Sequence, residues 1–270
     1  MTTVIQALFN PFVDFIRELG ALATFAAKTL RTAFTTRGNL PAVLDQIASV
    51  SFRSLSTVAF AGVFVGAILV LQYNVMLIEY DAQAFLGGLN TSSIVREIGP
   101  LIISFLLAGK VGAYTAAELG TMRVTEQIDA IECLGTNPLQ FLVVPRYIAI
   151  LVSSVILLAI GTMISILGSM VIADVFCGIN TLQFARSVPQ FTSGWTLFSG
   201  FFKSAVYGTI VATVSCYRGY TATGGAKGVG KAVTLSAVYI NFLIVLSNYV
   251  ANSFLEMVAE IGHGLFGGLG

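Results

Sequence analysis

The sequence predicts an all-α integral membrane protein, and two observations support that fold class. Of the 270 residues, 56% are hydrophobic and only 10% are charged, whereas soluble domains carry about 25% charged residues. Apolar runs of about 20 residues, the length needed to cross roughly 30 Å of hydrocarbon, recur along the chain. The predicted architecture is an N-terminal interfacial helix, five transmembrane helices, and a cytoplasmic helix between the second and third of them.

The first predicted region, residues 1–50, precedes a transmembrane domain over residues 51–270. Its apolar residues recur at helical spacing with charged residues between them, as is typical of a helix that lies in the membrane interface. A solvated leader is the alternative interpretation. A turn is expected at residues 38–41 because they include a glycine and a proline. The spaced apolar residues are Phe12, Phe15, Ile16, Leu19 and Leu22.

The transmembrane helices are predicted from the long apolar runs. Gly62 and Gly66 in the first run form a GxxxG spacing that permits close helix contact, and Gly161, Ser165 and Ser169 place small residues on one face of the third. The five helices are expected at about residues 55–78, 98–117, 141–173, 195–217 and 233–255.

The connecting segments are expected to be mostly irregular. Residues 79–93 predict a polar, glycine-containing loop, and residues 218–231 a glycine-rich one. A short helix is expected around residues 181–187. Trp195 would anchor the fourth transmembrane helix at the headgroups, and Pro100 falls in the first turn of the second, where proline is tolerated.

The distribution of basic residues predicts the orientation of the chain. With the N-terminus inside, the outer segments hold only Arg96 and Arg186, so the positive-inside rule places the N-terminus in the cytoplasm and the C-terminus outside. Cys177 then faces the opposite side from Cys133 and Cys216, which excludes a disulfide with either. The inner segments hold Arg17, Lys28, Arg31, Arg37, Arg53, Arg123, Arg146, Arg218, Lys227 and Lys231.

Residues 121–134 predict a complete amphipathic helix on the cytoplasmic side. Thr121 or Thr125 can cap its start, and Gly135 ends it. A plain connection is the alternative, but a connection needs only a few residues. The apolar face holds Val124, Ile128, Ile131 and Leu134, and the acidic face holds Glu126, Asp129 and Glu132.

Charged residues lie at the end of one predicted transmembrane helix and inside two of them. Arg96 and Glu97 either anchor the outer end of the second helix, with Arg96 reaching the headgroups, or line a cavity. Lys110 either reaches the inner interface or pairs with Glu118, or it contacts substrate. Lys203 lies eight residues after Trp195 and has the same alternatives.

Several function classes are disfavoured by composition. The net charge of +1 indicates no nucleic-acid partner. The single histidine, His263, and three widely spaced cysteines indicate no metal site of the usual N/S type. Residues 225–232 nearly form a P-loop, but Ala232 replaces the Mg²⁺-binding hydroxyl. No cofactor is expected, and an enzyme is the least favoured class because no nucleophile and base can be paired.

The stretch over residues 96–146 resembles the signature of the MlaE (YrbE-like) family of permeases. It reads REIGP…LLAGKVGAYTAAELGTMRVTEQIDAIECLGTNPL…VPR. The resemblance implies the membrane subunit of an ABC transporter that works with MCE proteins on lipids. It also implies that residues 121–134 are the coupling helix, which docks on the ATPase, and Arg123 and Glu126 are the favoured contacts. The implied coupling residues are Glu118, Arg123, Glu126, Gln127 and Asp129.

The resemblance also implies the partners and the binding site. Five helices are too few to surround a lipid, so a C2 homodimer with the cavity on its axis is expected. A separate ABC ATPase would bind ATP and Mg²⁺, a periplasmic MCE hexamer would receive phospholipid, and a STAS-domain protein would join the ATPase. The chain would lie in the inner membrane. The implied cavity residues are Arg96, Glu97, Leu69, Leu77, Ile78, Lys110 and Lys203.

Two other function classes stay open at this point. An ion-coupled secondary transporter or channel usually needs ionisable groups near the bilayer midplane, and Lys110 and Lys203 are the only charges well inside the predicted helices. Family members often carry arginine where this chain has Lys110, so positive charge is kept without bidentate pairing. The second alternative is a membrane anchor or scaffold for the MCE ring.

Overall fold

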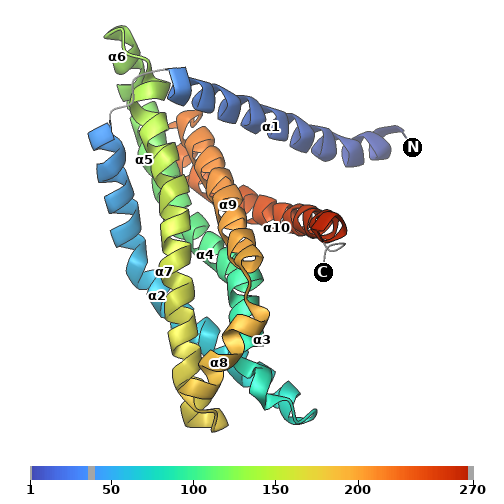
Figure 1. Cartoon of the computed structure of the whole chain (residues 1–270). Coiled ribbons are helices and arrows are strands. Elements are labelled where there is room, and N and C mark those ends of the chain that lie inside the picture. The colour runs from blue at the N-terminus through green and yellow to red at the C-terminus, as the bar shows by residue number, and fades with distance from the viewer. Residues whose placement is uncertain (1, 36–39, 267–270) are drawn as a thin grey trace.

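The computed structural model describes residues 2–35 and 40–266, and this part of the chain is helical with no strand (Figure 1). The long helices are α1 (Thr2–Thr35), α2 (Leu40–Ile78), α7 (Val144–Cys177), α9 (Gly194–Tyr220) and α10 (Gly225–Phe266). The short α-helices are α3 (Leu86–Ser93), α4 (Gly99–Leu107), α5 (Ala113–Val124), α6 (Gln127–Cys133) and α8 (Thr181–Phe191). A 3-10 turn, η1, covers Gln83–Phe85, and π-helical turns cover Ile94–Ile98 (η2), Ala108–Gly112 (η3) and Leu139–Val143 (η4).

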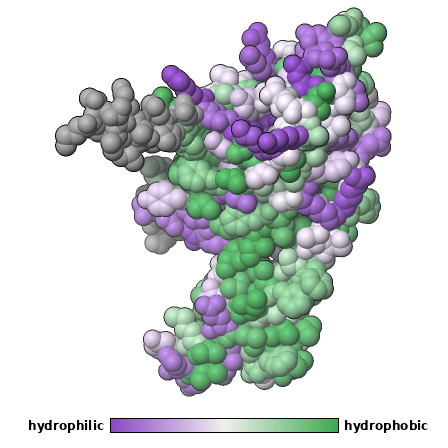
Figure 2. Space-filling model, turned by 180° about the vertical axis from the view of Figure 1, so that it is seen from behind, coloured by the Kyte–Doolittle hydropathy of each residue, from purple (hydrophilic) through white to green (hydrophobic). Residues whose placement is uncertain are grey.

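Four segments of the described chain are long and apolar enough to cross a membrane. Figure 2 shows hydrophilic residues gathered at the end of the molecule that carries α6, with a largely hydrophobic surface below it and a smaller hydrophilic group at the opposite tip. The fold is therefore that of a multi-pass membrane protein. The four segments are Leu40–Ile78, Leu139–Cys177, Gly194–Tyr220 and Gly225–Ile261.

The prediction of a loop over residues 79–93 is wrong, because α3 occupies residues 86–93. Its glycines allow close packing: a Cβ atom at Gly87 would lie 2.2 Å from the Phe184 carbonyl oxygen in α8. The Gly88 amide donates a hydrogen bond to the Ser187 hydroxyl at 2.9 Å. Glycine here serves close approach between two helices rather than a loop.

The helix predicted over residues 98–117 is part of a longer helical path. That path runs from α3 through η2, α4 and η3 into α5, so it begins before residue 98 and ends only at Val124. A π-helical turn lies on each side of α4, and such turns insert one extra residue and often mark functional sites. The three charged residues singled out at the start of this helix and inside it lie in these turns, with Arg96 and Glu97 in η2 and Lys110 in η3.

Close packing of α2 on α7 confirms the role predicted for the small residues. A Cβ atom at Gly66 would lie 2.1 Å from the Ser165 carbonyl oxygen, and one at Gly62 would lie 2.9 Å from the Gly161 carbonyl oxygen. Larger side chains on either helix would separate the two backbones. The α2–α7 pair is the most extensive contact in the molecule.

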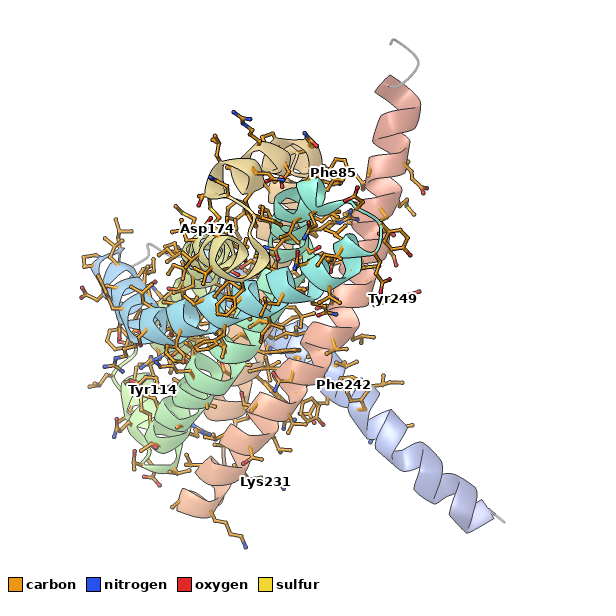
Figure 3. All side chains as sticks on the ribbon, turned by 90° about the horizontal axis from the view of Figure 1, so that it is seen from below. Phe85, Tyr114, Asp174, Lys231, Phe242 and Tyr249 are labelled. Carbon is orange, nitrogen blue, oxygen red and sulfur yellow. The ribbon has the colours of Figure 1, made fainter. Side chains whose placement is uncertain are left out.

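Helix α1 lies across the direction of α7 in Figure 1 and packs on α9 and α10. The Phe15 ring contacts the ring of Phe242 with centroids 5.4 Å apart, and Glu18 pairs with Arg218 at 2.8 Å. The side chains of Phe12 and His263 lie outside the described residues. Figure 3 shows α10 running obliquely past the other helices, with Phe242 and Tyr249 on its open flank.

The remaining boundaries differ from the predictions mainly by extension. α2 begins at Leu40 rather than residue 55, while residues 38 and 39 of the predicted turn lie outside the described chain. The glycine-rich loop shrinks to residues 221–224 because α10 already begins at Gly225. A Cβ atom at Gly228 would lie 1.8 Å from the Thr223 carbonyl oxygen, so that residue must be small for α10 to start there. The short helix expected near residues 181–187 is confirmed as α8.

Candidate functional site

A charged cluster forms where η2 meets α9 and α10. The Lys203 ammonium donates to Glu97 Oε1 at 2.6 Å and to the Arg96 carbonyl oxygen at 2.9 Å. The Asn252 side-chain amide donates to Glu97 Oε2 at 3.2 Å. The Arg96 guanidinium pairs with Glu256 Oε1 at 3.2 Å. These five residues, here called the outer cluster, join three elements that are far apart in the sequence.

Lys203 is the most deeply placed charge of the outer cluster. None of its side-chain surface is exposed, whereas 36% of the Glu97 side chain is. A buried ammonium is stable only when counter-charge and hydrogen bonds replace its water. Gly200, one turn earlier, allows this burial, because a Cβ atom there would lie 2.4 Å from the Val95 carbonyl oxygen. The close contact between α9 and η2 thus seats the lysine against Glu97.

The structure brings together only some of the residues predicted to line a cavity. Arg96, Glu97 and Lys203 meet in the outer cluster, and 41% of the Arg96 side chain is exposed. On α2, Ile78 is exposed and Leu69 half-buried. Leu77 is buried within its own chain, in a group of apolar residues from α2, α3, α7 and α8.

Lys110 lies apart from the outer cluster and does not pair with Glu118, as one of its predicted alternatives required. Its ammonium donates to the Arg53 carbonyl oxygen and to the Thr57 hydroxyl, the latter at 3.0 Å. Glu118 pairs instead with Arg146 at 3.0 Å. Within the described residues, Lys110 therefore has only neutral hydrogen-bond acceptors, both on α2.

Sequence reasoning missed the contribution of α10 to the outer cluster. Asn252 and Glu256 both bond there, and Asn248 accepts a hydrogen bond at 2.6 Å from the Tyr207 hydroxyl of α9. These three α10 residues recur every four positions, which places them on one face of a helix. A polar stripe of that spacing in an apolar run is a signal from which the site could have been found.

At the opposite end, the helix predicted over residues 121–134 is broken in two. α5 ends at Val124, and Glu126 takes the left-handed conformation with φ at 61° before α6 begins. The Thr125 hydroxyl donates to the Thr121 carbonyl oxygen at 2.8 Å rather than capping α6. Gly135, with φ at 76°, ends α6 as predicted.

Four of the five predicted coupling residues lie at this break, here called the α5–α6 turn, whereas Glu118 lies further back in α5 and pairs with Arg146. Arg123 forms an ion pair with Asp129 across the turn. Glu126 and Gln127 are exposed, while Ile128 is buried in a group of apolar residues from α1, α5, η4 and α9. The turn is thus anchored on the bundle by one isoleucine and presents its polar side chains outward.

The outer cluster and the α5–α6 turn both contain charged side chains, but neither has the set of ligands that a metal centre needs. Among the described residues, no group of three or more His, Cys, Asp or Glu side chains could hold a metal ion. Cys216 is buried, Cys177 half-buried and Cys133 exposed, and all three are free thiols.

Long apolar helices with charged side chains buried between them define a multi-pass membrane protein with a polar site inside its bundle. The family model "Permease MlaE" matches residues 43–254, well over half of the chain. The chain belongs to the MlaE permease family, whose members are permease subunits of ABC transporters.

Individual relatives agree with this family. A probable ABC transporter permease protein from Synechocystis is 39% identical over 206 residues, which is 76% of this chain and 78% of the relative. One from Rickettsia conorii is 34% identical over 238 residues, 88% of this chain and 92% of the relative. The intermembrane phospholipid transport system permease protein MlaE from Haemophilus influenzae is 28% identical over 253 residues, 93% and 97% of the two chains.

Proposed function

We propose that this chain is the permease subunit of an ABC transporter that moves phospholipid between the inner membrane and a periplasmic MCE protein. The observation that carries the proposal is the similarity, over nearly its whole length, to a relative whose name states intermembrane phospholipid transport. A separate ATPase subunit binds ATP and Mg²⁺ and supplies the energy, and a STAS-domain protein joins that ATPase.

The proposed layout has five crossings of the inner membrane and α1 in the interface. α2 and α7 run in the same direction in Figure 1, so the chain between them must return across the bundle. The path from α3 to α5 makes that return, although π-helical turns divide it. Arg123, Arg146 and Arg218 mark the cytoplasmic end by the positive-inside rule, which puts the N-terminus in the cytoplasm and the C-terminus in the periplasm.

The outer cluster is proposed to hold the lipid headgroup. Arg96 is partly exposed; it pairs with the exposed Glu256 at 3.2 Å and more loosely with Glu97 at 4.0 Å, so a phosphate can compete for its guanidinium. The Glu97–Lys203 pair fixes η2 behind it. In a homodimer the two clusters would face a shared cavity on the twofold axis, with Leu69 and Ile78 as apolar wall and Leu77 packed behind them.

The α5–α6 turn is proposed to receive force from the ATPase. Its exposed acid, Glu126, is held in position by the ion pair of Arg123 with Asp129 and by the buried Ile128. Closure of two ATPase subunits would push this turn, and α5 would transmit the movement through η3 and η2 to the outer cluster.

A specific observation also supports a second function, ion-coupled transport. The Glu97–Lys203 pair joins a buried lysine to a partly exposed glutamate inside a helix bundle, and proton-coupled carriers use ionisable groups in such places. That function predicts lipid or solute movement in proteoliposomes without any ATPase. A scaffold for the MCE ring predicts assembly without lipid-dependent ATP turnover.

The proposal is tested on the complex purified with its ATPase and MCE protein. We expect ATP turnover that rises with phospholipid, and phospholipid that copurifies and falls in Arg96→Ala when measured by mass spectrometry. Arg186→Ala, an exposed arginine on α8 outside the cluster, serves as the matched control. ATP turnover indifferent to lipid and MCE protein, together with unchanged lipid content in Arg96→Ala, would contradict the proposal.

A further inference from the structure

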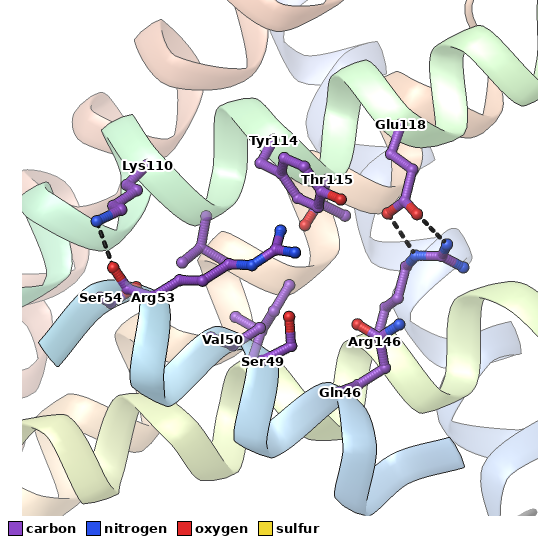
Figure 4. A pocket seen from close by; sticks show the side chains of 12 residues that line it. Gln46, Ser49, Val50, Arg53, Ser54, Lys110, Tyr114, Thr115, Glu118 and Arg146 are labelled. Atoms are coloured by element: carbon purple, nitrogen blue, oxygen red, sulfur yellow. Dashed lines mark hydrogen bonds and ion pairs between the residues drawn. The ribbon is translucent and has the colours of Figure 1, made fainter.

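A pocket of about 150 Å³, lined by charged, polar and apolar side chains, lies between α2, η3, α5 and α7 (Figure 4). It is separate from the outer cluster, with which it shares no residue. Because α2 and α7 both begin near the end that carries α6, the pocket lies toward that end (Figure 1). The side chains on which the argument depends are Arg53, Ser54, Lys110, Tyr114, Glu118 and Arg146.

The charges around the pocket do not balance. Glu118 and Arg146 neutralise each other through an ion pair at 3.0 Å. Lys110 bonds only neutral oxygens, and the Arg53 guanidinium lies over the Tyr114 ring, 5.3 Å from its centroid. Neither cation has a carboxylate partner within the described residues. Two cations beside one pocket provide the charge and the donors that an anionic group needs.

The pocket also contains a buried hydroxyl group with no partner. Ser54 is 2% exposed, and its Oγ atom has no hydrogen bond to any described group. A buried hydroxyl left unpaired costs free energy that a bound acceptor would recover. Together with the neighbouring arginine and lysine, Ser54 supplies a third donor for the same anion.

The surface of α2 beside the pocket is suited to acyl chains. Phe60 and Phe64 follow Arg53 by seven and eleven residues, so they lie on the same face of the helix. They are 69% and 52% exposed, and their ring centroids lie 4.9 Å apart. At 1.5 Å per residue, Phe60 is about 10 Å further along α2 than Arg53. The helix therefore presents donors first and apolar rings deeper in the membrane.

The size of the pocket limits what it can enclose. Sites that surround a drug-sized molecule measure about 300–1,000 Å³, so this one holds a headgroup but not the chains attached to it. We propose that the pocket binds the phosphate of an anionic phospholipid in the inner leaflet, with its acyl chains lying along Phe60 and Phe64. This site depends on the proposed orientation of α2 but not on the lipid specificity of the outer cluster.

The test uses the full complex in nanodiscs of phosphatidylcholine that contain phosphatidylglycerol with a photoactivatable group beside its phosphate. Peptide mass spectrometry locates the adducts. We expect adducts near Arg53 and Tyr114, and an about tenfold loss in Ser54→Ala, equivalent to about 1.4 kcal/mol of binding. That variant keeps both cations and should fold at least as well as the wild type, because it removes an unpaired hydroxyl.

Further variants and probes make the test decisive. The double variant Arg53→Gln with Lys110→Gln should lose the adducts, whereas Lys227→Gln, an exposed cytoplasmic lysine outside the pocket, should keep them. Adducts at the outer cluster should persist in all variants, so failure here is distinguishable from failure of the proposed transport function. Equal labelling by a phosphatidylcholine probe, displacement by inorganic phosphate, or a partner protein helix crosslinked there instead of lipid would overturn the proposal.

Discussion

Two lysines that lie within long apolar runs of the sequence, Lys203 and Lys110, have opposite surroundings in the structure. Lys203 is fully buried and contacts the carboxylate of Glu97 at 2.6 Å. Lys110 is exposed and contacts a carbonyl and a hydroxyl oxygen on α2. Both are lysines in apolar runs, yet only one has a carboxylate within reach. The difference follows from the neighbouring side chain: a carboxylate allows the Lys203 ammonium to be buried, whereas Lys110, without one, keeps its ammonium exposed and available for a ligand.

This comparison predicts the largest loss of stability when the buried lysine loses its counter-charge. Glu97→Gln should lower the free energy of unfolding by about 3–5 kcal/mol, because it leaves an uncompensated buried ammonium. Thermal unfolding of the purified protein measures the effect. Glu256→Gln is the matched control, since that acid is largely exposed and its pairing contributes only about 0–1 kcal/mol. Equal losses in the two variants would contradict the assigned burial of Lys203.

Removing the lysine should cost less than removing its partner. In Lys203→Met the remaining Glu97 is partly exposed and can be hydrated, so a loss of about 1–3 kcal/mol is expected. The double variant with Glu97→Gln should be more stable than Glu97→Gln alone, because the uncompensated charge is gone. Simple additivity of the two losses in thermal unfolding would show that the side chains do not interact.

The smallest effect on stability is expected for Lys110→Met. Its ammonium is exposed and bonds only neutral acceptors, so the free energy of unfolding should change by less than about 1 kcal/mol. Thermal unfolding run beside Lys203→Met sharpens the comparison directly. If Lys110→Met proved the more destabilising of the two, the distinction between an enclosed and an available lysine would be wrong.

Much of the fold follows from local sequence features. The long apolar runs predicted the positions of α2, α7, α9 and α10, and the resemblance to the permease family predicted the position of the α5–α6 region. Gly135 ended α6 as expected because a positive φ at a helix C-terminus suits glycine.

Two glycine-containing segments were predicted as loops, but their glycines allow close packing of helices instead. Gly87 in α3 and Gly228 in α10 each allow a backbone approach that a Cβ atom would block, so segments that look like loops are helical. The packing partner of Gly87 is remote in sequence, and pattern alone does not reveal it.

The outer cluster could be predicted only in part. Arg96 and Glu97 stood out as charges at the end of an apolar run, but the Glu97–Lys203 contact joins residues 106 positions apart. Glu97 lies in the π-helical turn η2, and no pattern in the sequence predicts a π-helical turn at this place. Likewise, the left-handed Glu126 interrupts a stretch whose apolar spacing fits one continuous helix.

The proposed mechanism has an external ATPase drive this permease through the α5–α6 turn. Two exposed acids with positive φ provide a matched pair, Glu126 at 61° in that turn and Asp81 at 52° at the opposite end of the molecule. The variant Glu126→Gly removes the carboxylate but can keep the left-handed backbone conformation, since glycine tolerates it. It therefore separates an effect of the side chain from an effect of the backbone.

The decisive measurement is lipid-stimulated ATP turnover of the reconstituted complex carrying Glu126→Arg or Asp81→Arg. We predict an about tenfold or greater loss in Glu126→Arg, equivalent to about 1.4 kcal/mol of activation free energy, and turnover close to wild type in Asp81→Arg. Wild-type turnover in Glu126→Arg, with the ATPase still bound, would contradict the claim.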